Sequence, residues 1–543
     1  MDGWRGSWAF SGMVKRTGIA TLLACALLAP LAHAVTWELN VEKFNQADLV
    51  AATAIQGLAN RDGAQIFLQT GDRDFMITFK NAEYGPGAEV TNKFRSVDDA
   101  WKDYYATRRG RKFVPVATLD ELAGKVGTRL KGVVLYRDEL AAAVTLAGLR
   151  AAVPVTDAVR AASPTLKALP VLEDLRGRFK DRQEAHRWAI KELLPSCSQD
   201  GAYSITHGID VVSLDVAVAK KMFVYQLNHT NEAAMVGEIL DHLHPISPVW
   251  GWGGPTEESF LFKVSEHGAF VMCTQVPNIS FHAAIRPAQR RFQQRHLQPV
   301  NVTVEPKHYV AFMVNEGDTM KCAGSLMMCG SWLQPERGTL PINWGVSPYL
   351  CEQFPGLMEF YYATMTMNDY FFDGPAGYGY IAPRYFPTNQ LFAFAAKTRA
   401  ANKVADTRFA ECWYFYGLQP DELRHRWLAA MGLDGLTQWR GPQRISFPAT
   451  NCPPIIDSQH YYDKGTADEI AEELKREAAG APRPWFTVVY GGSPRKFAEI
   501  ARLLPADRFK IVRLDELFIA AQKSRASIEK KVVKPATMEK KKP

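Results

Sequence analysis

Two acidic residues with the spacing of a catalytic pair follow an apolar run in the C-terminal half of the chain. Tyr309 to Val314 is continuously apolar, as is typical of a strand buried on both faces, and Glu316 and Asp318 come directly after it. Residues two apart in a strand point to the same side, so both carboxyl groups could face one pocket. Hydrolysis of a glycosidic bond needs two such carboxyl groups. A polar turn around Gly317 is the alternative interpretation.

A third acid follows the aromatic run 359–363, which we expect to be a strand. Asn368 and Asp369 stand a few residues after it. We expect Asp369 to act with Glu316 or Asp318 as the second catalytic carboxyl group, and Asn368 to contact the substrate. A separation of about 5–5.5 Å between the carboxyl groups would imply retention, and about 6.5–9.5 Å inversion. An Asn-Asp turn or helix cap is the alternative.

The segment 373–383 is a constrained loop that carries aromatic residues. Its three glycines and two prolines surround Tyr378 and Tyr380. Aromatic faces bury the CH faces of sugars, so we expect both tyrosines to bind a carbohydrate. An aromatic plug at one end of a barrel is the alternative. Further candidates for sugar contacts, each with a core or solvated position as its alternative, are Trp250, Trp252, Glu257, Trp332 and Trp344.

Motifs for other chemistries are missing from the sequence. His242 and His244 lack the HExxH spacing of a catalytic zinc site, no GxSxG is present, and Gly491 to Pro494 does not match a P-loop. We therefore expect no cofactor. A metal ion held by oxygen atoms of Glu316, Asp318 and Asp369 is the alternative left open.

The elements around these residues predict an α/β protein. Short apolar runs alternate with helical patterns over 301–522, which predicts a TIM-barrel-like (β/α) domain, with an open doubly wound sheet as the alternative. Mixed helix and strand patterns before it predict smaller α/β domains over 35–130, 131–230 and 231–300.

The N-terminus has the three parts of a secretory signal peptide. Lys15 and Arg16 precede an apolar run, and Ala32-His33-Ala34 ends it. We therefore expect cleavage near Ala34 and a secreted, periplasmic or extracellular protein. Lipid attachment at Cys25 is disfavoured because the apolar run continues past it. No later apolar run is long enough to cross a membrane, so we expect no transmembrane segment in the mature protein.

The positive charge is concentrated at the ends of the chain. The 543 residues carry a net charge of +7, and most of it lies in residues 1–34 and in the Lys-rich tail 523–543. The body between them is close to neutral, which argues against a nucleic-acid partner. We expect the tail to be disordered.

Taken together, these segments resemble the GxGYxYP putative glycoside hydrolase family. The naming loop stands here as Pro375-Ala376-Gly377-Tyr378-Gly379-Tyr380-Ile381, and the family's DGDN as Glu316-Gly317-Asp318-Thr319. The Asn368-Asp369 pair, the segment 55–62 (IQGLANRD) and the stretch 249–252 (VWGW) with Glu257 also match. The chain departs from the family pattern at Glu316, Thr319, Pro375 and Ile381.

The resemblance implies an N-terminal region of several α/β parts, a TIM-barrel-like C-terminal domain and a carbohydrate substrate. An exported glycoside hydrolase acting on a poly- or oligosaccharide follows from it. A non-catalytic carbohydrate-binding or scaffold protein on a degenerate barrel is the alternative from another class.

Overall fold

The computed structural model describes residues 35–72, 95–205, 208–288, 292–296, 300–314, 320–327, 330–439, 445–448, 452–458, 460–461 and 465–532. The predicted signal peptide, with Cys25 and Ala34, lies outside the described residues. So do Glu316 and Asp318.

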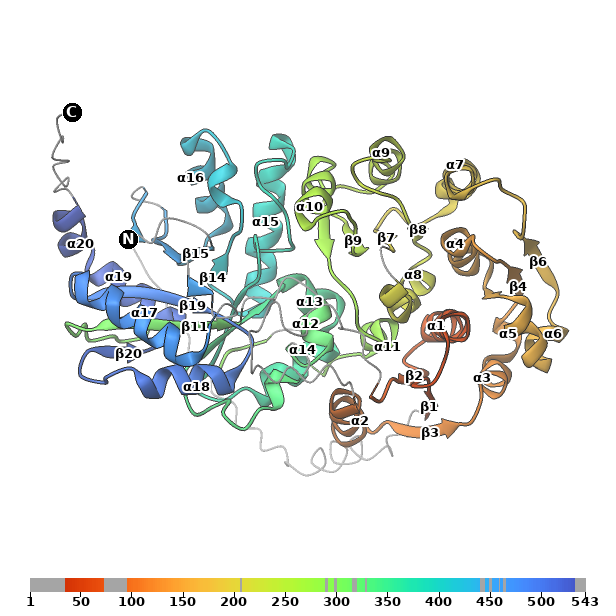
Figure 1. The fold of residues 1–543 in the computed structure, drawn as a ribbon, viewed down its shortest axis with the longest axis horizontal. Coiled ribbons are helices and arrows are strands. Elements are labelled where there is room, and N and C mark those ends of the chain that lie inside the picture. The colour runs from red at the N-terminus through yellow and green to blue at the C-terminus, as the bar shows by residue number, and fades with distance from the viewer. Residues whose placement is uncertain are drawn as a thin grey trace, which may run out of the picture.

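The chain has a mixed α/β fold in which three small parallel sheets precede one large curled sheet. In Figure 1 the small sheets occupy the right half and the large sheet the left half. The first sheet has the order β2-β1-β3. The elements of this part are β1 (Val35–Asn40), α1 (Gln46–Asn60), β2 (Ile66–Gln69), α2 (Arg95–Arg109), β3 (Lys112–Val116) and α3 (Leu119–Val126).

Helix α1 is the central element of the N-terminal half (Figure 1). The Asn45 side chain caps it by accepting from the Asp48 N–H, and 12 of its 15 residues are buried because they are apolar or small nearly all round. The polar residues of the 55–62 motif hold it in place. Gln56 donates to Asn278 (2.6 Å) and Asn60 to Ser280 (2.9 Å).

The second and third small sheets follow along the chain, with orders β5-β4-β6 and β10-β9-β7-β8. The second comprises β4 (Gly132–Leu135), α4 (Leu140–Arg150), β5 (Ala152–Val155), α5 (Asp157–Ala162), α6 (Pro164–Ala168), β6 (Val171–Asp174) and α7 (Arg182–Glu192). The third comprises β7 (Ala202–Ser204), α8 (Leu214–Lys220), β8 (Phe223–Tyr225), α9 (Ala233–Asp241), β9 (Pro248–Gly251), α10 (Glu257–Glu266), β10 (Phe270–Met272) and α11 (Ile279–Ala284).

The boundary between these two sheets differs from the expected one at residue 230. Strands β7 and β8 lie before that residue, yet β7 pairs with β9 (Tyr203 opposite Trp250). Both therefore belong to the third sheet. Strand pairing, and not a change in the local sequence pattern, therefore sets this boundary.

The large sheet has the order β16-β17-β15-β14-β13-β12-β11-β19-β18, and β20 also pairs with β11. Its strands are β11 (His308–Val314), β12 (Ile342–Val346), β13 (Asp369–Asp373), β14 (Phe409–Glu411), β15 (Gly435–Trp439), β16 (Ile445–Ser446), β17 (Ile455–Ser458), β18 (His460–Tyr461), β19 (Trp485–Tyr490) and β20 (Phe509–Ile511). Its helices are α12 (Met320–Gly324), α13 (Pro348–Gln353), α14 (Pro355–Thr364), α15 (Thr388–Ala405), α16 (Asp421–Met431), α17 (Ala467–Gly480), α18 (Pro494–Leu503), α19 (Leu514–Lys523) and α20 (Arg525–Val532).

This sheet is curled into a half-barrel. Strand β17 pairs with β15, and β18, one residue further on, pairs with β19 on the other side of the sheet. Every pairing is parallel except that of β16 with β17. The antiparallel β16 and the extra strand β20 differ from the eight-fold repeat of the TIM barrel that we expected.

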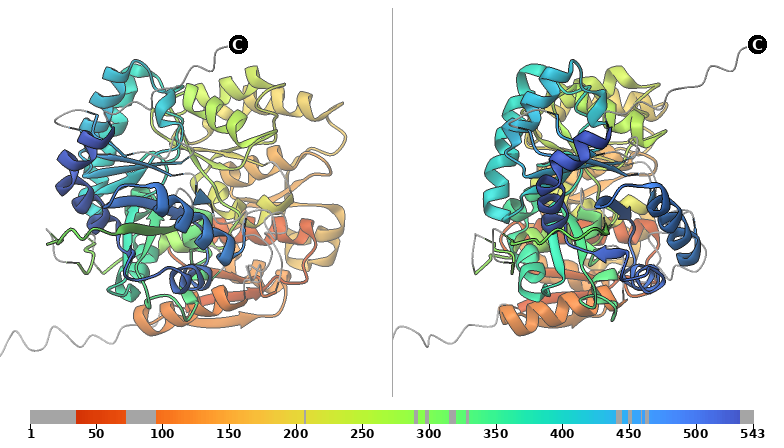
Figure 2. Two further views of the ribbon diagram at one scale, coloured as in Figure 1. Left: turned by 60° about the vertical axis from the view of Figure 1, so that its left-hand side comes forward. Right: turned by 90° about the vertical axis from the view of Figure 1, so that its left-hand side faces the viewer.

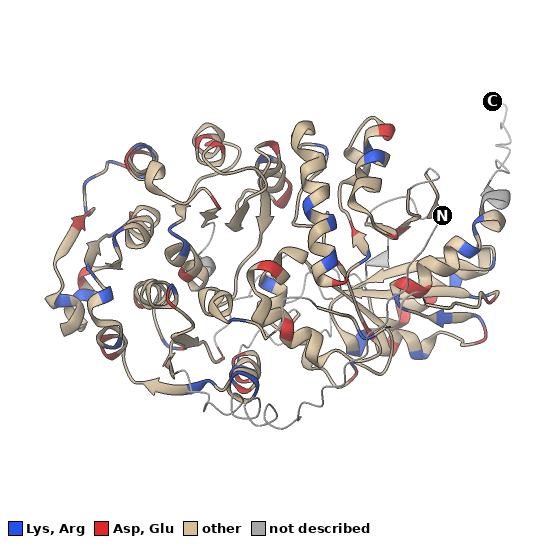
Figure 3. Ribbon diagram, turned by 180° about the vertical axis from the view of Figure 1, so that it is seen from behind, with Lys and Arg blue, Asp and Glu red and all other residues tan. Residues whose placement is uncertain are grey.

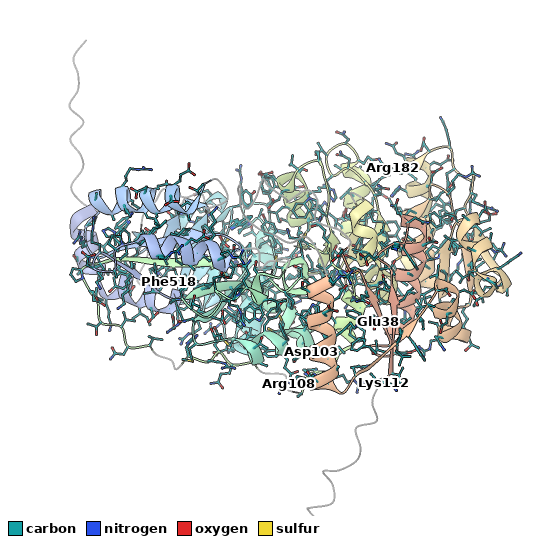
Figure 4. All side chains as sticks on the ribbon, turned by 60° about the horizontal axis from the view of Figure 1, so that its bottom comes forward. Glu38, Asp103, Arg108, Lys112, Arg182 and Phe518 are labelled. Atoms are coloured by element: carbon teal, nitrogen blue, oxygen red, sulfur yellow. The ribbon has the colours of Figure 1, made fainter. Side chains whose placement is uncertain are left out.

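Helix α19 packs against apolar side chains of the curled sheet. Its Phe518, labelled in Figure 4, stacks on Phe409 of β14 at 5.1 Å between ring centroids. The Leu514 N–H at its start donates to Asn343 of β12. Figure 2 shows the helices of this half around the sheet from two further sides.

The first part of the basic tail is helical, whereas we expected the whole tail to be disordered. Helix α20 covers Arg525–Val532, and Ile528 is buried among the apolar residues of the sheet and α19. The predicted disordered segment from 523 therefore begins with helical residues, and its remainder from 533 lies outside the described residues. In the part of the chain that the structure describes, no helix is long and apolar enough to cross a membrane.

Candidate functional site

Asp369 lies at the amino end of its strand. The aromatic run 359–363, expected as a strand, belongs to helix α14, which Pro355 begins. Strand β13 starts only at Asp369, opposite Ile342, the first residue of β12. Asp369 therefore begins a strand, whereas a catalytic acid was expected after one.

The Asp369 carboxylate is held by hydrogen bonds from three neighbouring residues. Its side chain is fully buried, and its two carboxylate oxygens accept from Arg337 (2.6 Å), from the Trp344 indole N–H (2.9 Å) and from the Thr366 backbone N–H (2.7 Å). A buried acid held by a guanidinium and two further donors is satisfied where it lies. The ion pair with Arg337 therefore gives Asp369 a structural role.

Three of the predicted sugar-binding residues surround Asp369. Trp344 is fully buried, Trp332 is 1% exposed and lies under the Arg337 guanidinium, and the Asn368 side chain donates to the Gly338 carbonyl (2.7 Å). The two tryptophan rings are in edge-to-face contact at 4.9 Å. Trp332 and Trp344 are therefore core residues, and burial removes both from a sugar-binding surface.

Tyr378 and Tyr380 are also buried. Tyr378 donates to Glu352 (2.7 Å), Tyr380 donates to Glu257 (2.5 Å), and Tyr380 forms a bridge with Val271 next to the third sheet. The loop therefore packs between the third small sheet and the curled sheet. The structure matches the alternative interpretation of this loop as an aromatic plug.

Glycine is required at two positions of the loop for two different physical reasons. Gly377 has a φ of +94°, where a side chain is strained. Gly379 has ordinary φ, but a Cβ there would lie 2.2 Å from the Phe270 ring. One glycine thus permits the turn and the other permits close packing on β10.

Acids and aromatics from distant segments meet beside this plug, in what we call the junction cluster (Glu257, Glu258, Tyr380, Trp413 and Tyr414). Tyr380 contacts Trp413 edge to face (5.7 Å), and Tyr414 donates to Glu258 (3.4 Å). Except for Tyr380, these side chains are half-buried and so reach solvent. Half-exposed carboxylates beside aromatic rings can contact a sugar.

Of the remaining predicted residues, the two tryptophans of the 249–252 stretch differ from each other. Trp250 is fully buried against Phe354, whereas Trp252 is half-buried and packs on Phe260 of α10, the helix that carries Glu257. Trp252 therefore remains a candidate for substrate contact, and Trp250 belongs to the core.

The carboxyl ends of the curled sheet hold a different acid, Glu411. It is the last residue of β14, and its neighbours include Tyr490 at the end of β19 and Thr437 on β15. All three are fully buried. Burial, together with the nearby Glu411 charge, raises the pKa of Tyr490.

Glu411 was missed because its segment was interpreted only as a strand. The run 408–415 is otherwise mostly apolar, and an acid inside a buried strand is the signal that could have drawn attention to it. Strand β11, which precedes Glu316 and Asp318, pairs with β19 so that Met313 lies opposite Tyr490. Within the described residues, no group of three or more His, Cys, Asp or Glu side chains could hold a metal ion.

Models of three domains of one family match the chain. They are the GxGYxYP_N second domain over residues 130–197, the GxGYxYP third domain over 211–284, and the GxGYxYP putative glycoside hydrolase C-terminal domain over 306–522. The chain belongs to the GxGYxYP family. The family's naming loop is thus, in this member, the aromatic plug between the third small sheet and the curled sheet.

A solved structure shares the fold. It is described as a putative hydrolase from Bacteroides thetaiotaomicron VPI-5482, is 18% identical, and aligns with a TM-score of 0.76 over 90% of this chain and 95% of that one. No curated protein matches the chain. At this identity the likeness concerns the fold alone.

Proposed function

We propose that this GxGYxYP protein is an exported glycoside hydrolase that cleaves a poly- or oligosaccharide. The observation that carries the proposal is the placement of Glu411 at the carboxyl end of a parallel strand, beside the Tyr490 hydroxyl. Enzymes built on such sheets hold their catalytic residues at this edge. Family membership supports the reaction class, and export rests on the predicted signal peptide.

Burial of the Glu411 side chain favours a chemical role. Taking a carboxyl group out of water costs several kcal/mol, so buried acids at a strand's carboxyl end are candidates for chemistry. Tyr490 and Thr437 supply neighbouring hydroxyl groups. Hydrogen bonds from such groups can orient the acid toward the glycosidic oxygen.

A second carboxyl group is needed, and Glu316 and Asp318 are the proposed sources. They follow β11, whose Met313 lies opposite Tyr490. In this arrangement the curled sheet works as a TIM-barrel-like domain, with acids from β11 and β14 on either side of the bond. Asp369 is not part of this proposed site, because Arg337 and Trp344 hold it at the opposite end of the sheet.

The junction cluster supplies the sugar contacts in this proposal. Glu257, Glu258, Trp413 and Tyr414 are half-buried, and Trp252 packs on Phe260 of α10. Trp413 comes two residues after Glu411. A sugar stacked on the Trp413 ring would therefore lie near the proposed catalytic acid. Carboxylates accept from sugar hydroxyls while the rings cover CH faces.

The test is the release of reducing ends from a broad polysaccharide panel. We expect the wild type to release sugar and Glu411→Gln to lose at least most of that activity, with Glu316→Gln or Asp318→Asn losing it as well. Glu422→Gln, an exposed acid on α16, is the matched control and should retain activity. Activity that survives in Glu411→Gln would remove Glu411 from the site but leave the enzyme class.

A non-catalytic carbohydrate-binding protein is the second candidate. It is favoured by the ion pair that holds Asp369, because an acid paired in this way is not available as the second catalytic carboxyl group. No release from any polysaccharide, combined with measurable binding to one of them, would establish this second candidate.

A further inference from the structure

A cleft in the N-terminal half of the molecule is lined by many positively charged side chains. Its volume is about 1310 Å³, and it lies where helices α1, α2, α8 and α11 end. Its lining includes six cationic side chains, which we call the basic cleft residues: Arg61, Arg108, Arg109, Arg111, Lys220 and Arg286. Figure 4 labels Arg108 at the end of α2, close to Lys112 at the start of β3.

The charge of this cleft is not balanced by acids. Asp62 is the only acid among the described residues that line it. Arg109 pairs with Glu359, which lies on α14. In the described part of the chain, neither Arg108 nor Arg286 has an ion-pair partner. Elsewhere on the ribbon, acidic and basic residues are interspersed (Figure 3), and the body as a whole is close to neutral.

Three of the cations are held in place by neutral groups. Arg61 donates to the carbonyls of Gly148 and Val218 (2.6 Å each), Arg111 donates to the Ala64 carbonyl (2.6 Å), and Lys220 donates to Gln353 (3.3 Å). These contacts fix the side chains, and the carbonyl dipoles and the nearby acids Asp62 and Asp200 offset only part of their charge. Burial lowers the pKa of Arg61, Arg111 and Lys220, and an anion entering the cleft would offset that cost.

Helix ends account for part of this charge. Cations in the last turn of a helix interact with its dipole, worth about 0.3–1 kcal/mol each, and Arg108, Arg109 and Lys220 occupy such positions. Arg111 and Arg286 lie two residues beyond the ends of α2 and α11. The negative poles of the four helices therefore account for part of this convergence, but the six cations still outnumber the two acids, Asp62 and Glu359, beside them.

We propose that the basic cleft binds an anionic polysaccharide segment through its carboxylate or sulfate groups. Guanidinium groups match these anions with two parallel hydrogen bonds, and the volume accommodates several sugar units. The carbohydrate nature of the ligand rests on the proposed function, whereas its negative charge rests on the cleft alone.

Binding to defined polysaccharides tests this proposal without using hydrolysis. Isothermal titration with the full chain would compare polygalacturonate, dextran sulfate and neutral dextran at roughly 0.05 M and 0.5 M salt. We expect at least one anionic chain to bind tenfold or more tighter than dextran and to weaken strongly in high salt. Preference for polygalacturonate would identify a carboxylate site, and preference for dextran sulfate a sulfate site.

Exposed residues provide the variants, because their replacement should not disturb folding. Arg108→Glu with Arg286→Glu reverses two charges of the cleft. Lys131→Glu with Arg187→Glu is the matched control, since both residues are exposed and lie outside the cleft lining. We expect the first pair to weaken anionic binding at least tenfold and the control pair to leave it within twofold.

Three results would overturn the inference. They are equal binding of anionic and neutral chains, an equal effect of the two variant pairs, which would point to the net charge or to the basic tail, and tighter binding of duplex DNA than of either anionic polysaccharide. Failure here is distinguishable from failure of the proposed function. Hydrolysis of a neutral glycan without anion binding overturns only the cleft, and anion binding without hydrolysis of any glycan overturns only the enzyme.

Discussion

Two buried acids on neighbouring strands of the curled sheet show how position decides the role of a carboxyl group. Asp369 begins β13 and Glu411 ends β14, so they lie at opposite edges of the same parallel sheet. Asp369 is paired with Arg337, whereas Glu411 neighbours the hydroxyl-bearing side chains of Tyr490 and Thr437. We infer that the first carboxyl group stabilises the fold, and we propose that the second takes part in catalysis. Substitutions at these and neighbouring residues test this difference.

The largest expected effect is on activity. Glu411→Gln should lower the rate of reducing-end release by roughly 10²–10⁴-fold, the usual contribution of a positioned acid or base. The midpoint of thermal unfolding should change little, because the amide keeps the shape of the acid. Measured rates and melting curves of the same preparation check this. If the variant unfolds but retains its rate per folded molecule, Glu411 is structural and the contrast fails.

Asp369 should behave in the opposite way. Asp369→Asn leaves the Arg337 guanidinium buried without its acid, which typically costs about 3–5 kcal/mol of unfolding free energy. Urea unfolding would measure this loss, and the rate per folded molecule should remain near that of the wild type. Arg337→Met combined with Asp369→Asn should cost less than Asp369→Asn alone, since no buried charge is then left. A loss of rate without a loss of stability would return Asp369 to the catalytic set.

Strand β13 carries a second buried acid at its other end, and it predicts a pH dependence. Burial raises the pKa of Asp373 to about 7, although Asn402 donates to it (2.6 Å). The folded chain therefore binds more protons than the unfolded chain between about pH 4 and 7. Stability should fall as the pH rises through this window, by a few kcal/mol for this group.

Asp98 and Asp215 have pKa values raised to about 7 for the same main reason, burial, and they add to the slope. Unfolding midpoints measured from pH 5 to 8 would show the trend, and Asp373→Asn should make it shallower. A midpoint that rises with pH in both proteins would contradict the assigned environment of these acids.

The smallest expected effect separates the plug from the junction cluster. Tyr380→Phe removes the hydrogen bond to Glu257, and Tyr378→Phe removes the one to Glu352. Each should cost about 1.5–3 kcal/mol, as for other hydrogen bonds to charged groups. Only Tyr380→Phe should also raise the KM for the polysaccharide, because Glu257 reaches solvent beside Trp413. Equal KM values in the two variants would show that the junction cluster does not contact substrate.

Local patterns determined much of this protein directly. The apolar runs 309–314 and 485–490 are strands β11 and β19, and the helical patterns 389–403 and 420–431 are helices α15 and α16. Family membership was predicted from short motifs and is confirmed by the domain models. Such features depend on periodicity and on short spacings, which the chain carries wherever it folds.

The site depended on contacts between distant residues. The run 359–363 suits a strand or a helix by composition, and packing around Trp332 made it a helix, which moved Asp369 to the start of β13. Tyr380 meets Glu257 across 123 positions of sequence, and Glu411 meets Tyr490 only because the sheet curls. Burial and strand pairing decide whether an acid is held by a cation or faces a reaction, and both arise only in the tertiary structure.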